Sequence, residues 1–432
     1  MKNIFRAIGF GAAVVAFSAT SSFAQANPCE DPFETKNAEY QKFRENIKSP
    51  ITIEKLEIAV ASGDGFNTRY AACEDTKPIV KYITDKMPAV KETLVDLKRT
   101  KKFNDGVTNG VWADAFSAGK EIVSVKGKEP ISLDVAIVLS MIGFDQASAK
   151  NDSFNNDSIA MAETVIKKIE SGMTSEKYGA FGKYELKTTA FPDGKQNALG
   201  WMNYIIGYIK GERQGNKKEG LAYYHKAVTK SNSAIKGYPE VFQAIGDFYV
   251  ADFNKIEQER GDLYKANGDK EDEKTLAMWD LQKGYLDRAI DAYARAYNAA
   301  AAIEKAAPAD KKAAAKTYKD NFYKFLGTLY KNRFDKTDGL DPFISAQISK
   351  PMPDPTSEVM PVKEVAPTAT TTTTNPTSTT TKPTDTTTKP TSTTTTTTKP
   401  TDTMTKPTST TTTKPTSSTT PKKPVTKKKS GR

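Results

Sequence analysis

Residues that build metal sites and catalytic nucleophile pairs are scarce in this sequence. Its 432 residues hold one histidine, His225, and two cysteines, Cys29 and Cys73. A protein metal site needs several nitrogen, sulfur or oxygen ligands that converge, and one histidine with two distant cysteines does not supply them. His225 also lacks the strand–nucleophile–helix setting of a hydrolase. We therefore expect a histidine that is packed or exposed, and a protein without a cofactor.

Calcium and phosphate loops are missing as well. The segment Asn151–Asp157 is rich in side-chain oxygens, but it lacks the glycine and the terminal glutamate at the spacing of a calcium-binding loop. It fits better as a loop that ends in a helix N-cap at Asp157 or Ser158. No glycine-rich loop follows a strand, and no pair of carboxylates stands in an apolar setting that would shift a pKa. The sequence thus favours a protein that is not an enzyme.

Long apolar runs are confined to the N-terminus. Lys2 and Arg6 precede an apolar run of about ten residues, and Ala24–Ala26 offers a small-x-small cleavage site, so residues 1–26 are typical of a secretory signal. A helix needs about 20 apolar residues to cross a membrane, and no later stretch reaches this length. We expect an exported mature chain, periplasmic or extracellular in the cell envelope. In that oxidising setting Cys29 and Cys73 are a candidate disulfide, and two unrelated thiols are the alternative.

The positive charge is concentrated at the two ends of the chain. Of the formal net charge of +11, the signal carries +2 and residues 368–432 carry +9, so the remainder is neutral. A basic folded face for specific nucleic-acid binding is therefore not expected. The end of the chain is rich in Thr, Pro and Lys and has almost no apolar side chain to bury. We expect a disordered tail over 354–432, whose lysines suit an anionic wall polymer or lipopolysaccharide.

The part between the two ends carries a recurring helical pattern. In the last copy, Tyr323, Leu326, Gly327 and Tyr330 are spaced i, i+3, i+4 and i+7. Gly339, Phe343, Ala346 and Pro351 follow this run. Shorter forms of the same core recur at Leu139–Gly143, Asn203–Gly207 and Phe242–Tyr249. This order of aromatic, Leu-Gly, Tyr, then small, Phe, Ala and Pro resembles the tetratricopeptide repeat.

The resemblance covers 133–353 and implies an all-α solenoid of helical hairpins, preceded by a helical N-terminal region over 27–132. One copy is about thirty residues longer than a regular repeat, and its apolar stripe continues through the extra length. We predict two long antiparallel helices there, over about 239–266 and 270–306, with the turn at Gly268.

In tetratricopeptide arrays the first helices line a concave groove that receives a peptide. Transferred by motif register, the groove-facing residues are Tyr204, Tyr208, Gln243, Asp247, Asn321, Lys324, Thr328 and Lys331. Burial is the alternative for Tyr204 and Tyr208, because their helix is apolar on every side. The sequence favours a non-enzymatic interaction or scaffold protein with an unidentified protein or peptide partner. The alternative is an envelope-polymer hydrolase with a carboxylate site in the repeat groove.

Overall fold

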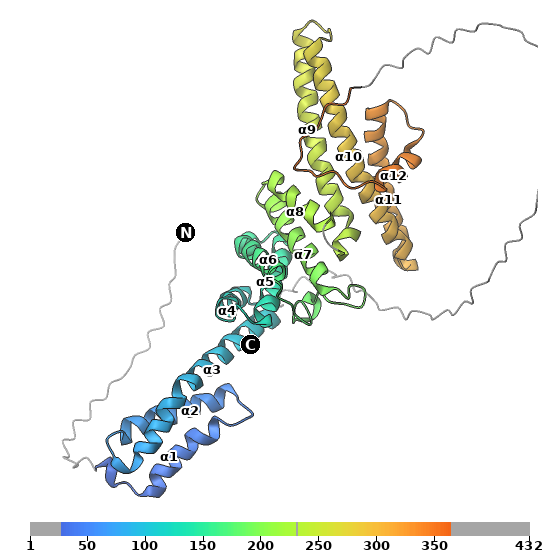
Figure 1. Ribbon diagram of the computed structural model, residues 1–432. Helices are drawn as coiled ribbons and strands as arrows, with labels where there is room; N and C mark the ends of the chain where they lie inside the picture. The colour runs from blue at the N-terminus through green and yellow to red at the C-terminus, as the bar shows by residue number, and fades with distance from the viewer. Residues whose placement is uncertain (1–26, 230–231, 364–432) are drawn as a thin grey trace, which may run out of the picture. The chain divides into compact units, whose positions relative to one another are not determined.

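The computed structural model describes residues 27–229 and 232–363, and within them every regular element is helical (Figure 1). The predicted all-α fold class is therefore confirmed. The predicted signal over 1–26 and most of the predicted tail lie outside the described residues.

The α-helices follow one another with short connections, apart from an irregular stretch between α6 and α7. Their bounds are α1 (Phe33–Asn46), α2 (Ile53–Tyr70), α3 (Lys77–Asn109), α4 (Trp112–Val125), α5 (Pro130–Ser148), α6 (Asn155–Glu170), α7 (Gly194–Tyr208), α8 (Lys217–Thr229), α9 (Pro239–Ala266), α10 (Glu273–Ala306), α11 (Ala309–Phe334) and α12 (Leu340–Ile348).

The N-terminal region forms a core of its own from α1, α2 and the first half of α3. Phe43, Phe66 and Ile83 are fully buried in it. A proline inside a helix usually kinks or breaks it, but α3 continues through Pro88 as a single helix. We attribute this to tertiary packing, because Met87 and Val90 on either side of the proline are both buried and hold the backbone in place.

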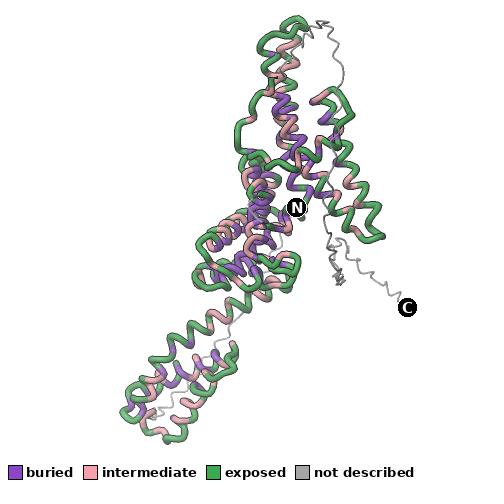
Figure 2. The backbone as a smooth tube through the Cα atoms, turned by 45° about the vertical axis from the view of Figure 1, so that its right-hand side comes forward, coloured by how far each residue is buried: buried purple, intermediate pink, exposed green. Residues whose placement is uncertain are grey.

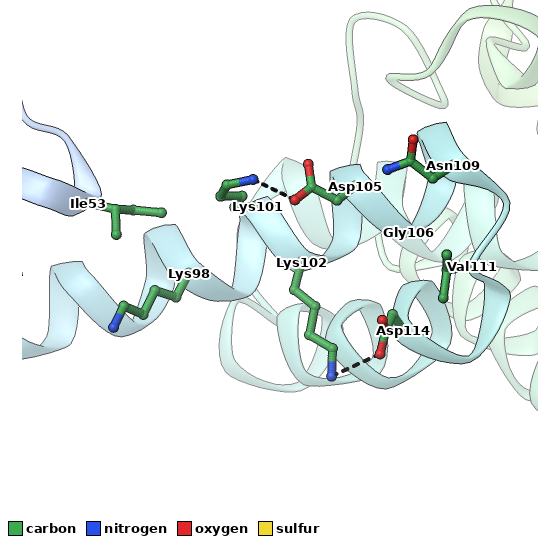
Figure 3. A pocket seen from close by; sticks show the side chains of 9 residues that line it. All are labelled: Ile53, Lys98, Lys101, Lys102, Asp105, Gly106, Asn109, Val111 and Asp114. Atoms are coloured by element: carbon green, nitrogen blue, oxygen red, sulfur yellow. Dashed lines mark hydrogen bonds and ion pairs between the residues drawn. The ribbon is translucent and has the colours of Figure 1, made fainter.

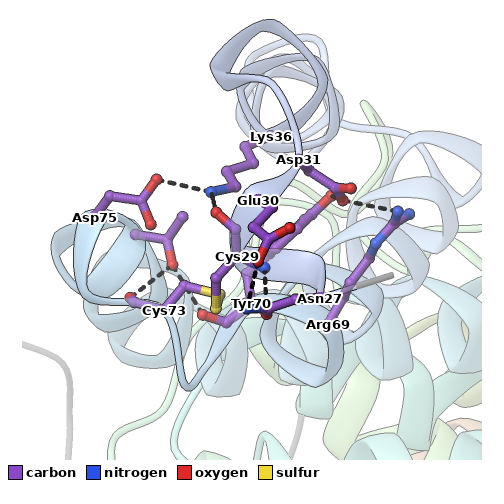
Figure 4. Close-up of a disulfide and its surroundings, with 10 residues drawn as sticks. Asn27, Cys29, Glu30, Asp31, Lys36, Arg69, Tyr70, Cys73 and Asp75 are labelled. Carbon is purple, nitrogen blue, oxygen red and sulfur yellow. Dashed lines mark hydrogen bonds and ion pairs between the residues drawn. A yellow bond between two sulfur atoms is a disulfide. The ribbon is translucent and has the colours of Figure 1, made fainter. Parts of the chain in front are cut away.

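A disulfide between Cys29 and Cys73 ties the start of the chain to the end of α2 (Figure 4). Beside it, the buried ammonium of Lys36 donates to the Cys29 carbonyl at 2.7 Å and to Asp75 at 2.8 Å. A buried cation needs such partners to offset its lost hydration. The segment before α1 is thus held by the disulfide and by the hydrogen bond from the buried Lys36 ammonium to the Cys29 carbonyl.

Helix α5 lies at the centre of the next core, which also includes the end of α3 and helices α4, α6 and α7. It is long and apolar enough to cross a membrane, but 72% of its most apolar window is buried inside the fold. A helix that is apolar on all sides is also typical of the centre of a folded domain.

The predicted pairs of helices pack as hairpins, and glycines on the first helix allow the close approach. In the α7–α8 pair a Cβ on Gly207 would come within 2.7 Å of the Tyr224 ring, and in the α9–α10 pair a Cβ on Gly246 would come within 2.5 Å of Tyr293. The fourth unit, the most regular in sequence, is the loosest. Its Gly327 has Leu340 at 3.8 Å as the nearest neighbour, and α12 has only nine residues.

The predicted long hairpin is present as α9 and α10, with Gly268 in a left-handed conformation at the turn (φ 68°). Helix α10 begins at Glu273, three residues later than predicted, because Asp272 and Thr275 form a capping box. Figure 2 shows buried residues in the part of the hairpin next to the other helices and exposed residues at its tip.

Two sequence predictions are wrong, one about the start of a helix and one about the end of the folded body. Helix α6 begins at Asn155, so Asp157 and Ser158 lie inside it and cap nothing, while Asn151 caps the preceding turn through its side chain. The folded body also does not end at Pro353. Residues 354–363 lie against α10, because Arg288 binds their backbone carbonyls. Such a long-range contact leaves no periodic signal in the sequence.

Candidate partner groove

Helices α9 and α11 run in the same direction on either side of α10, and a groove of about 430 Å³ lies between them. Ion pairs and ring contacts fix α11 antiparallel to α10, from Glu304–Lys319 to Asp287–Arg333. The lining comes from all three helices and consists of Gln243, Asp247, Tyr293, Tyr318, Asn321, Phe322 and Phe325. Three of the eight predicted groove residues, Gln243, Asp247 and Asn321, thus meet in one hollow.

Tyr293 of α10 connects the polar and apolar parts of this lining. Its hydroxyl donates a hydrogen bond to Asp247, and its ring centroid lies 4.6 Å from that of Phe325. Burial, together with the Asp247 carboxylate, raises the pKa of Tyr293 far above its usual range. The phenol therefore stays protonated and holds the carboxylate in place at the groove wall.

Both walls carry free amide groups, Gln243 on α9 and Asn321 on α11, and the α11 wall also carries an exposed ring. Neither Gln243 nor Asn321 makes a side-chain hydrogen bond to another described residue, and Phe325 is 37% exposed. Tyr318 donates to Glu240 at 2.7 Å, and burial raises its pKa. Amide groups can both donate to and accept from a peptide backbone, and the rings offer a surface for an apolar side chain.

Tyr204 does not line this groove. Its side chain is buried, with ring centroids of Phe144, Tyr224 and Tyr238 between 5.5 and 6.2 Å away. Burial raises its pKa strongly. Tyr208 belongs to the same aromatic cluster and is partly buried. Both residues thus pack against neighbouring rings. This is the burial that the sequence analysis gave as the alternative to a position in the groove.

Lys324, Thr328 and Lys331 lie on α11 in the same helical stripe as Asn321, spaced three to four residues apart. All three are exposed and lie beyond the lining of the groove. Neither lysine forms an ion pair with another described residue. The helix that forms one wall of the groove thus also carries two exposed cations that are available to a partner.

The carboxylates that line the hollows away from this groove stand together with lysines. A second hollow of about 430 Å³, between α6, α7 and α8, holds Glu163 and Glu170 together with Lys167 and Lys226. Burial raises the pKa of Asp291, but its carboxylate is held by Arg295 at 3.0 Å. Burial also raises the pKa of Asp252, which lies apart from both hollows.

A third hollow lies at the start of α2 and along α3 and α4 (Figure 3). Its lysines are already paired, Lys101 with Asp105 at 2.5 Å and Lys102 with Asp114 at 3.3 Å. The third lysine of this hollow, Lys98, pairs with Glu57 at 2.7 Å, so none of its lysines is left unpaired for an anion.

The largest hollow of those described here, about 640 Å³, contains His225. Its walls come from α8, the start of α9, α10 and the residues after α12, with Pro351 and Met352 among them. Within the described residues the Nε2 atom of His225 is buried and has no hydrogen-bond partner. The described part of the chain holds no group of three or more metal-ligating side chains.

Comparison with known proteins adds no relative. No family model, no curated protein and no solved structure matches this chain. Its function is therefore inferred from the residues and their geometry alone.

Proposed function

We propose that this protein is a non-enzymatic scaffold with tetratricopeptide-like repeats, and that it binds an extended segment of a protein partner in the groove between α9 and α11. The observation that carries the proposal is the lining of this groove. Gln243, Asp247 and Asn321 come from the first helices of two successive hairpins, and they stand beside the exposed ring of Phe325. Sites of this kind combine an apolar surface with a few polar groups that set orientation.

The cations along α11 support the same proposal. Lys324 and Lys331 would contact acidic groups of a partner that leaves the groove along this helix, and matched charges raise association rates and specificity. We further propose that the protein is exported, as residues 1–26 suggest, and that its Thr/Pro/Lys-rich end tethers the body to an anionic polymer of the cell envelope.

The test is capture of partners from an envelope extract with a photo-crosslinking residue in place of Phe325. Asn321→Ala with Gln243→Ala should reduce crosslinked partner about tenfold or more, since each lost hydrogen bond is worth about 1 kcal/mol. Lys324→Glu with Lys331→Glu should reduce it as well. Charge reversals at exposed positions change fold stability by about 0.5 kcal/mol or less.

The matched control reverses two other exposed lysines of the same helix, Lys311→Glu with Lys312→Glu. It applies the same charge change to α11 away from the groove, and capture should persist. If all three double variants capture every partner as the unmodified chain does, the groove is not the binding site. If the purified protein cleaves an envelope polymer and substitution of the groove carboxylate Asp247 abolishes this activity, the hydrolase alternative replaces the scaffold proposal.

A further inference from the structure

The residues after α12 return along α10 in an irregular path with one turn at residues 354–357, and we call residues 351–363 the strap. Arg288 of α10 holds it in the middle. The guanidinium donates to the carbonyl oxygens of Asp354 at 2.8 Å, Glu358 at 2.9 Å and Ser357 at 3.3 Å. It also donates to the Ser357 hydroxyl at 3.0 Å. Three of these four acceptors are backbone atoms, so the arginine recognises the shape of the strap more than its side chains.

The surface of α10 is also shaped to receive the strap. A Cβ on Gly284 would overlap the carbonyl oxygen of Met360 and lie 3.0 Å from a methyl carbon of Val359. The missing side chain thus lets the strap backbone touch the helix. Pro355 of the strap is buried, whereas Met360 is 67% exposed, so one side of the strap is covered and the other side faces solvent.

The strap is fastened at both ends as well. Just before its start, Arg295 donates to the carbonyl of Lys350 at 2.7 Å, and near its end the Val362 amide donates to the carbonyl of Asp280 at 2.8 Å. Arg295 and Asp280 are fifteen residues apart on α10, so the strap carries the chain about 22 Å along the helix toward the hairpin turn.

The strap lies on the side of α10 that faces away from the partner groove. Gly284 and Tyr293 are nine residues apart, which is two and a half turns of an α-helix, so they point in opposite directions. Tyr293 forms part of the groove lining and Gly284 touches the strap. The last described residue, Lys363, therefore lies on the far side of α10 from the groove.

We infer that this face of α10 is an interaction surface for a non-helical segment, that residues 351–363 are its partner, and that their docking makes α10 the anchor of the tail. The last described residue, Lys363, then lies at the back of the long hairpin, away from the groove, and not at the end of α12. The inference extends the proposed tethering role of the tail. Only the purpose of the anchor rests on that proposal. The docking itself stands without it.

The experiment compares two helical glycines by hydrogen exchange in the full chain. Gly284→Ala puts a methyl group into the strap contact, whereas Gly261→Ala in α9 meets nothing within 4 Å. In the unmodified protein the Val362 amide should exchange at least about tenfold slower than in an unfolded peptide. Gly284→Ala and Arg288→Ala should abolish this protection, and Gly261→Ala should retain it.

A distance measurement checks the position of the anchor. Spin labels at residues 363 and 274, introduced through cysteine in the full chain, should give a narrow distance distribution that broadens in Gly284→Ala and Arg288→Ala. A Val362 amide without protection in the unmodified protein, or a narrow distribution that survives both variants, overturns the inference. Partner capture through the groove is measured separately, so its failure leaves this result intact.

Discussion

Gln282 is a buried polar residue without a visible purpose in the α9–α10 hairpin. Its side chain is fully buried, and within the described residues neither its amide nitrogen nor its amide oxygen has a hydrogen-bond partner. Leaving such groups unpaired costs about 1–3 kcal/mol. We predict that Gln282→Leu, which keeps a similar volume, raises the free energy of unfolding by about 1–2 kcal/mol in urea denaturation.

The control is Gln258→Leu on α9, an exposed glutamine for which the same substitution should change stability by about 0.5 kcal/mol or less. A loss of stability in Gln282→Leu would contradict the prediction. It would mean that the amide binds an internal water molecule that the substitution expels.

Gly246 shows how closely the two helices of one hairpin approach. A Cβ at this position would come within 2.5 Å of the Tyr293 ring, which is itself held by the hydrogen bond to Asp247. We predict that Gly246→Ala destabilises the protein by about 1–3 kcal/mol through overpacking. Gly65→Ala in α2 meets nothing within 4 Å and should stabilise its helix slightly. Equal thermal shifts for both variants would show that α9 can move away from α10 at little cost.

Among the elements, α1 and α2 depend most on a covalent link. The Cys29–Cys73 disulfide closes a loop of 44 residues, and in the chain-entropy model this stabilises by about 4 kcal/mol. We predict that Cys29→Ser with Cys73→Ser raises the amide exchange rates of α1 and α2 by at least about a hundredfold. Exchange in α9 and α10 should stay unchanged, because their buried residues belong to another core.

The measurement is the hydrogen-exchange protection of the amides in α1 and α2, because a global melting curve averages over several cores. Unchanged exchange in the double variant would show that Lys36 and the apolar residues around Phe43 hold this part without the disulfide.

The elements with strong local signals were predictable. The glycines of α7 and α9, and the aromatic residues that oppose them on α8 and α10, indicated the hairpins because close helix packing needs a small residue opposite a large one. The long hairpin was predictable for a similar reason. Its apolar stripe runs on to a single Asn-Gly-Asp turn, and Gly268 adopts the left-handed conformation that such a turn needs.

Features that depend on tertiary contacts were not predictable. Continuity of α3 through Pro88 depends on neighbours that bury both sides of the proline. The groove includes Tyr293 and Phe325, which are not among the residues transferred from the repeat pattern, because a groove needs a floor and walls as well as polar groups. The strap depends on Arg288, some seventy residues earlier in the chain, and no local pattern connects the two.

At the scale of the whole molecule, the positive charge of the tail predicts salt-sensitive binding. Residues 368–432 carry +9, while the remainder after the signal is neutral. We expect the full chain to bind vesicles with anionic headgroups at low salt and to lose most of this binding at about 0.15 M salt, where the screening length is about 8 Å. A chain that ends at Lys363 should not bind under either condition. Vesicle binding by that shorter chain would assign the interaction to the body.

The strap also moves the boundary of the folded body from Pro353 to Lys363. A chain that ends at Lys363 retains Pro355, Val359 and the carbonyl groups that Arg288 binds, and we predict that it unfolds at the same temperature as the full chain. A chain that ends at Pro353 loses these contacts and exposes the surface around Gly284. It should lose about 1–3 kcal/mol of stability, since the bonds to Arg288 are charge-assisted but partly exposed to water. Calorimetry on the three chains decides the matter. Identical melting of both shortened chains would place residues 354–363 outside the body, whereas a loss confined to the shorter one makes the strap its last element.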